Sequence, residues 1–189
     1  AARTAPIPVP FLCENIPPIE YKNIPQNQPK RLVRLASVEQ WSPALATLTD
    51  GWSVPLEQWR DAPPHTAAVE LPRGMFGSEK AIAEELKQAS AYIPSAVCGN
   101  IGALPLVREA GMRAIGGMGL NLTNTQALAT YAERGLSSAV LSPELRLSRL
   151  PKAFPLPVGL TVYGRLPLML TRNCPRRCAL GAHACAACR

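Results

Sequence analysis

The sequence predicts an α/β fold, a partial TIM-type barrel of parallel strand–helix units, and three observations support this prediction. From Arg31 onward, short apolar segments alternate with helical periodicity at intervals of about fourteen to twenty-six residues, as in parallel strands joined by helices. Helix-capping residues and glycines separate these segments. Leu35-Ala36-Ser37 follows the first apolar segment without the glycines of a dinucleotide-binding turn, so a barrel is favoured over an open doubly wound sheet.

The length of the chain bounds how much of a barrel it can form. An eight-unit barrel needs about 250 residues, so a chain of 189 residues predicts only part of one. We therefore expect a fragment of a longer protein. Its predicted parts are a Pro-rich arm or linker over 1–30, a partial βα barrel over 31–170 and a cysteine-rich segment over 171–189.

The arm contains seven of the chain's 20 prolines, each of which removes an amide donor and disfavours helix in the residue before it. The predicted strands cover 32–35, 52–56, 67–71, 92–97, 112–115, 136–141 and 158–163. A capping box at Ser37 and Gln40 predicts a helix start, and further helices are expected over 79–88, 101–110 and 125–134. Gly111 and Gly135 end two of them, and Ser142-Pro143-Glu144 predicts the start of another.

Composition excludes some classes of protein. With 47% hydrophobic residues the chain can form a core, and no apolar run is long enough to span a bilayer, so we expect no membrane association and a cytoplasmic location. The formal charge of +7 makes an anionic partner such as RNA plausible, although charge alone decides little.

Four of the six cysteines lie close together near the C-terminal end, with the spacing C-x3-C-x6-C-x2-C. Thiolates that share a metal must converge on it, and short spacers with small residues permit this. The spacing predicts a metal or cluster site, with zinc and iron–sulfur both open and disulfides as the less favoured alternative. His183 lies among these thiols as a neighbour, and Cys13 and Cys98 are expected outside the site. The predicted ligands are Cys174, Cys178, Cys185 and Cys188.

Several segments between Arg31 and Cys174 resemble one family. They are 35–40, 99–103, 119–124, 141–145 and, most specifically, 162–175, which begins Val-Tyr-Gly-Arg-Leu-Pro-Leu-Met. The stretch is similar to the C-terminal half of the catalytic barrel of the collagenase-like peptidases of unknown catalytic type, in their long-chain branch.

The resemblance implies a TIM-type barrel followed by a cysteine cluster. Several relatives are oxygen-independent hydroxylases that carry an iron–sulfur cluster on four cysteines and modify transfer RNA, ribosomal RNA or a quinone precursor. It thus implies cluster ligation by Cys174, Cys185 and Cys188, whereas Cys178 lies closer to Cys174 than the family pattern has it. The first half of the barrel is not represented, so a missing barrel half or a second copy is expected as a partner.

In a barrel, catalytic residues belong at the carboxyl ends of the strands. Asn100, Asn121 and Asn124 are candidate substrate-binding residues, with a plain helix cap favoured for Asn124. Glu144 is a candidate acid or base, or equally part of a helix start. Tyr163 and Arg165 are the stronger catalytic candidates, because a guanidinium can hold a carboxylate or phosphate in two parallel hydrogen bonds. Alternatively, Arg165 has a purely structural role and braces the cysteine segment. Glu70 is a further residue at a predicted strand end.

We therefore expect part of an iron–sulfur-dependent, oxygen-independent hydroxylase of RNA bases that uses a small anionic oxygen donor and is inactive as an isolated fragment. One alternative is a peptidase acting on collagen-like or small peptides, although the sequence has neither an HExxH helix nor a GxSxG turn and His65 lies in a predicted loop. The other is a non-catalytic module stabilised by zinc.

Overall fold

The computed structural model describes residues 28–146, 148, 150, 153–167, 169–171 and 173–181. The expected Pro-rich arm up to residue 27, with Cys13, lies outside these residues. So do His183, Cys185 and Cys188 of the cysteine segment.

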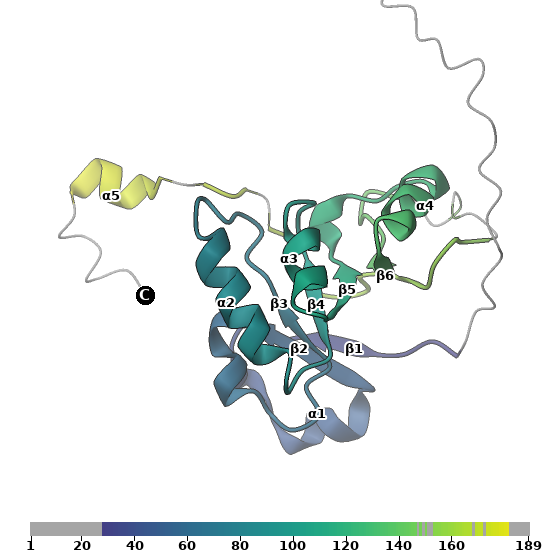
Figure 1. Ribbon diagram of the computed structural model, residues 1–189, viewed down its shortest axis with the longest axis horizontal. Coiled ribbons are helices and arrows are strands. Elements are labelled where there is room, and N and C mark those ends of the chain that lie inside the picture. Colours follow the sequence, from purple (N-terminus) through teal and green to yellow (C-terminus); the bar gives the residue numbers. More distant parts are fainter. Residues whose placement is uncertain are drawn as a thin grey trace, which may run out of the picture.

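Seven parallel strands form one sheet, and their order in the sheet is their order in the chain (Figure 1). This confirms the predicted α/β class and partial TIM-type barrel. Among the described residues, β1 and β7 each have a single neighbouring strand. The strands are β1 (Leu32–Arg34), β2 (Gly51–Pro55), β3 (Ala68–Glu70), β4 (Ser95–Cys98), β5 (Arg113–Gly116), β6 (Leu136–Val140) and β7 (Val158–Gly159).

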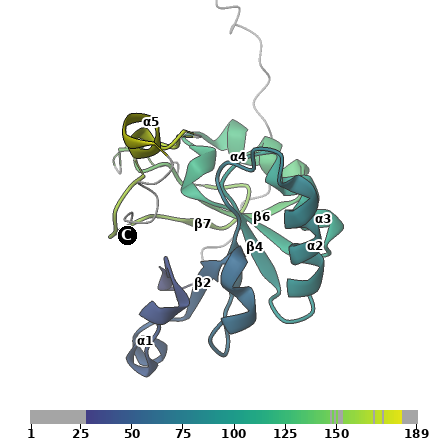
Figure 2. The same ribbon diagram turned by 90° about the vertical axis from the view of Figure 1, so that its left-hand side faces the viewer.

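Four α-helices lie along the outside of the curved sheet, and α5 follows it in the chain (Figure 2). They are α1 (Pro43–Leu48), α2 (Glu79–Ala89), α3 (Ala103–Glu109), α4 (Thr125–Glu133) and α5 (Pro175–Leu180), with short 3-10 helices at η1 (Val38–Gln40), η2 (Leu56–Asp61) and η3 (Met118–Leu120). No described helix combines the length and apolarity that a membrane span requires.

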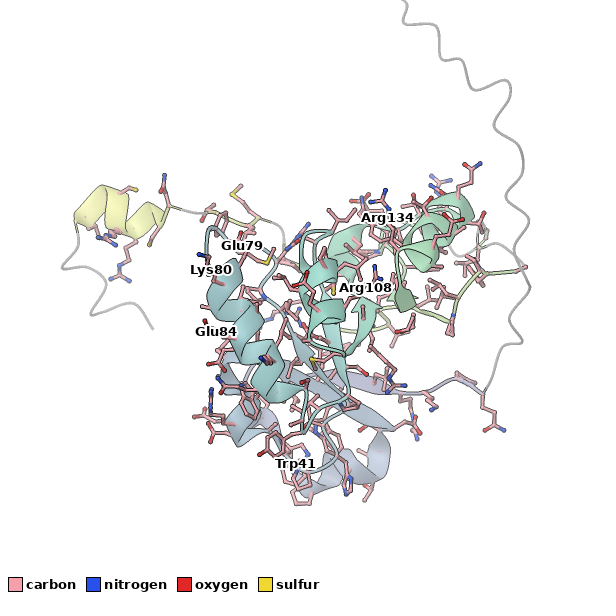
Figure 3. The ribbon with its side chains drawn as sticks, in the orientation of Figure 1. Trp41, Glu79, Lys80, Glu84, Arg108 and Arg134 are labelled. Atoms are coloured by element: carbon pink, nitrogen blue, oxygen red, sulfur yellow. The ribbon has the colours of Figure 1, made fainter. Side chains whose placement is uncertain are left out.

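The core lies between the sheet and α2, α3 and α4. Side chains alternate along a strand, so every second residue faces the helices, and Val54, Val69 and Ala96 are completely buried there. The face of α2 that the sequence predicts, Ile82 with Leu86 and Ala89, is buried against them. Lys80 and Glu84 of α2 are exposed, as expected (Figure 3).

The helix boundaries follow the predicted signals. Ser37 and Gln40 form both halves of the capping box, but this box begins the 3-10 helix η1, and α1 begins separately after Ser42. Gly111 and Gly135 adopt φ values of 73° and 97°, the left-handed conformation that glycine takes most easily after a helix. Arg108 Nη1 then donates a hydrogen bond to the carbonyl oxygen of Arg134, 3.2 Å away, which ties α3 to the end of α4 (Figure 3).

The prediction of a helix that starts at Ser142-Pro143-Glu144 is wrong. No α-helix lies among the described residues of 142–157, and a turn stands at this place, in which the amide nitrogens of Glu144 and Leu145 donate to Oγ and the carbonyl oxygen of Ser142. The capping signature is local, and Pro151 follows too soon for a long helix to develop.

Two predicted strand ends lie more than one residue from the ends in the structure. β4 starts at Ser95 because Tyr92 and Ile93 still donate to the carbonyl oxygen of Ala89 and close the end of α2. β7 ends at Gly159 instead of residue 163. The amide of Leu141 still donates to the carbonyl oxygen of Gly159, and the chain beside it then enters the turn after Ser142.

Candidate functional site

The carboxyl ends of the strands bring polar residues from several loops to one end of the sheet. Asn100 follows β4, where its Nδ2 donates to the carbonyl oxygen of Arg73 at 2.7 Å and its Oδ1 accepts from the amide of Ala103 at 3.0 Å. The side chain thus starts α3 and fastens the loop after β3 to the loop after β4. The side-chain nitrogen and oxygen of Asn100 both have backbone partners, so this residue holds the two loops in position.

Asn121 follows β5 and has a left-handed backbone, with φ 50° and ψ 48°. Its Oδ1 accepts a 2.5 Å hydrogen bond from Oγ of Ser142, a buried residue after β6. A bridge between Leu122 and Leu141 holds the two loops together beside this contact. Asn121 itself is exposed, so its Nδ2 can donate to a ligand.

Gly119 brings the loop after β5 against the loop after β4. A Cβ atom at this position would lie 2.4 Å from the carbonyl oxygen of Gly99. Two segments that carry the family resemblance, 99–103 and 119–124, are therefore in direct backbone contact, and no side chain fits between them.

The other predicted polar residues take simpler positions. Asn124 Oδ1 accepts from the amide of Ala127 at 2.8 Å, so Asn124 is the N-cap of α4. The sequence favours this role over substrate binding. Glu144 is exposed in the turn after β6. Within the described residues it forms no hydrogen bond with Asn100 or Asn121.

Tyr163 and Arg165 follow β7, where Tyr163 and Gly164 form a bend. Tyr163 is 96% exposed, and Arg165 is exposed as well. Neither makes a hydrogen bond or an ion pair within the described part of the chain. The segment then passes the loop after β3, where Leu170 and Phe76 both approach Gly74.

Cys174 and Cys178 are exposed free thiols one helical turn apart. Cys174 is the N-cap of α5, and its Sγ accepts from the amide of Arg177 at 3.5 Å. The amide of Cys178 donates to the carbonyl oxygen of Cys174 at 3.0 Å. No group of three or more possible metal ligands lies within the described residues, and Cys185 and Cys188 lie outside them.

Cys98 is also a free thiol, but it is buried, whereas Cys174 and Cys178 are exposed. It is completely buried on the helix-covered face of β4, and burial raises the pKa of its thiol to about 12. It serves as a small apolar core residue, apart from the cysteine segment, as the sequence predicts.

The structure contains one polar cluster that the sequence does not predict. Ser53 Oγ donates to Oε1 of Glu70 at 2.8 Å, and Arg34 Nε forms an ion pair with Oε2 of the same carboxylate. Arg34 and Glu70 are the last residues of β1 and β3. Glu70 is recognisable as a strand-end residue, but its partners depend on strand register.

The chain matches no model of a known protein family, no curated protein and no solved structure. The resemblance of the sequence segments to the collagenase-like peptidases stays a prediction.

Proposed function

We propose that the chain forms part of the barrel of an iron–sulfur-dependent, oxygen-independent hydroxylase of RNA bases, as its resemblance to the collagenase-like peptidases implies. One observation carries the proposal: the exposed thiols of Cys174 and Cys178 stand one helical turn apart, in the segment that leaves the last strand of a parallel barrel sheet at its carboxyl end. That end of a barrel is where its chemistry takes place.

The thiols fit a cluster in chemistry and in setting. Neither is in a disulfide, and the amide of Arg177 already points at Sγ of Cys174. Hydrogen bonds from backbone amides to sulfur tune the potential of iron–sulfur clusters. In the proposal Cys185 and Cys188 complete the ligand set, and the bound cluster supplies electron transfer or Lewis-acid chemistry.

The remaining residues bind and orient the reactants. Arg165 is exposed, so its planar fork can hold a small anionic oxygen donor, with Tyr163 beside it in the chain. Asn121, oriented by Ser142, offers an amide to the RNA base. Arg176 and Arg177 are exposed beside the thiols and favour an approaching phosphate backbone.

The open sheet supports a partner in this function. β1 and β7 each have one neighbouring strand among the described residues, and Leu32 on β1 is 65% exposed. We propose that the missing part of the barrel, or a second copy of the chain, completes the enclosure before catalysis.

Metal analysis of the anaerobically purified chain tests the ligand set. We expect iron and sulfide together, with the absorption of an iron–sulfur cluster, and loss of both in Cys174→Ser and in Cys178→Ser. Cys98→Ala is the matched control and should keep them, because Cys98 lies in the core. Zinc without sulfide would replace the cluster by a zinc-stabilised module, and protein that stays free of metal after reconstitution would reject both.

Activity distinguishes the hydroxylase from the peptidase. Mass spectrometry of RNA from cells that lack the gene should show the loss of a hydroxylated base, and the gene with Arg165→Lys should fail to restore it, since an ammonium cannot form the planar fork. Peptide cleavage that is independent of the cluster, with unchanged RNA hydroxylation, would establish the peptidase instead.

A further inference from the structure

The inner face of the sheet, opposite the helices, carries one polar cluster in which Arg34, Ser53 and Glu70 meet. Arg34 pairs in register with Ser53, and Ser53 Oγ reaches Glu70 on the next strand. Their neighbours along the strands, Val54 and Val69, are completely buried beneath the helices. Because side chains alternate, the cluster faces the concave side of the barrel sheet.

The two charged members of the cluster differ in accessibility. The side chain of Glu70 is only 14% exposed, and each of its carboxylate oxygens already has a partner, Ser53 Oγ or Arg34 Nε. The side chain of Arg34 is 59% exposed, and among the described residues its Nη groups donate no hydrogen bond. The cluster therefore holds a guanidinium by its Nε side and leaves the other edge open.

Fold stability gives little reason for such an arrangement. An ion pair that is partly removed from water gains little over apolar side chains of the same size, because desolvation offsets the attraction. The opposite face of the same strands shows that this sheet can be packed with apolar residues, such as Val54 and Val69. A charged cluster at two strand carboxyl ends has the position of a binding site in a barrel.

We infer that Arg34 is an oxyanion-binding residue on the inner face, and that Glu70 and Ser53 are positioning residues that orient its guanidinium. The open edge of Arg34 presents two Nη groups that can donate two parallel hydrogen bonds to a carboxylate or a phosphate. Fixing the Nε side removes rotamer freedom before the ligand arrives, so less entropy is lost on binding. This site does not depend on the cysteine segment or on a metal.

Side-chain NMR of the full-length protein tests the inference directly. The Nε–Hε signal of Arg34, assigned by its disappearance in Arg34→Lys, should shift saturably when sodium phosphate or sodium acetate is added at constant ionic strength. The phosphate and acetate arms distinguish the two sources of the oxyanion. Saturation in either arm supports the site, and a signal that stays still or drifts linearly in both arms overturns it.

Variants separate binding from positioning. Arg34→Lys keeps the charge but should weaken the saturable binding by about tenfold or more, because it loses the planar fork. Glu70→Gln keeps Arg34 and should weaken binding less. The control is the outer ion pair of Arg60 and Glu85: Glu85→Gln should leave binding unchanged. If Arg34→Lys binds as well as the wild type, the assignment is overturned. If a variant fails to fold, the wild-type titration alone tests the inference. The Nε–Hε signal of Arg60 then serves as the internal reference and should not shift saturably.

Discussion

Val54, Val69 and Ala96 are completely buried where the strands face the helices, whereas Ser53 and Glu70 on the same strands are only half-buried on the opposite face. The first set packs against apolar side chains of α2 to α4. The second set includes an ion pair and a hydroxyl. The two faces share one backbone, so the difference lies entirely in which residues alternate along each strand. It teaches that the fold is stabilised from the outer face, which leaves the inner face free to carry charge.

The largest expected effect is the loss of a core side chain from the outer face. Leu86→Ala removes a completely buried residue of α2 and should lower the free energy of unfolding by about 3 kcal/mol. Leu32→Ala on β1 is the matched control, and since Leu32 is 65% exposed the change should stay below about 1 kcal/mol. Urea unfolding measures both. Equal losses would contradict the contrast between the faces.

The backbone contact between the loops after β4 and β5 gives the next effect. Gly119→Ala places a Cβ 2.4 Å from the carbonyl oxygen of Gly99, so we expect a loss of about 1–3 kcal/mol as the loops separate. Gly159→Ala has its nearest neighbour at 3.9 Å and should change stability little. Thermal unfolding of the two variants compares them, and a wild-type melting temperature for Gly119→Ala would show that the loops are not in contact.

Cys98 extends the comparison to pH. Burial raises the pKa of its thiol from 9.0 to about 12, so the folded state keeps a proton that the unfolded chain releases above pH 9. This contribution to stability is complete below pH 9 and is lost as the pH rises toward 12, at up to about 1.4 kcal/mol per pH unit. Cys98→Ala should therefore show a shallower loss of stability between pH 9 and pH 11.

Thiol labelling at neutral pH measures independently which cysteines are buried. In the metal-free protein, Cys174 and Cys178 are exposed and should react quickly with a maleimide, while Cys98 should react only on unfolding. Rapid labelling of Cys98 in the native protein would place it outside the core.

The smallest effect comes from the outer ion pair. Arg60 donates to both carboxylate oxygens of Glu85, and Trp59 Nε1 donates to one of them. The hydrogen bonds from Arg60, followed by that from Trp59, lower the pKa of Glu85 below its ordinary value of 4.5. Their contribution is present above pH 4.5 and is lost as the pH falls through the lowered pKa. Glu85→Gln should be slightly less stable than the wild type at pH 7, and urea titrations should show this difference shrinking from pH 4.5 to pH 3. A difference that does not shrink by pH 3 would point to packing instead of charge.

The fold was predictable because its signals are local. The capping box at Ser37 and the glycines at 111 and 135 act within one turn of their own position, and the apolar stripe of α2 depends only on helical spacing. Ser142-Pro143-Glu144 shows the limit of such signals, since the same cap chemistry forms a turn when no helix follows.

The sites were less predictable, because they depend on register. Arg34, Ser53 and Glu70 are far apart in sequence, and a shift of one residue in any strand would turn a member to the other face. Asn121 was predictable as a strand-end residue, but its contact with Ser142 requires the neighbouring strand. Asn124 is the opposite case, since its cap role is local and was foreseen.

The identity of sheet order and chain order also bears on how the protein folds. Each strand finds its partner across a single connecting segment, so no pairing waits for a distant part of the chain. Among parallel sheets, this order keeps each loop closure short and so limits its entropy cost. During synthesis, each new strand can add to a sheet that is already formed, so assembly can proceed from β1 toward β7 as the polypeptide leaves the ribosome.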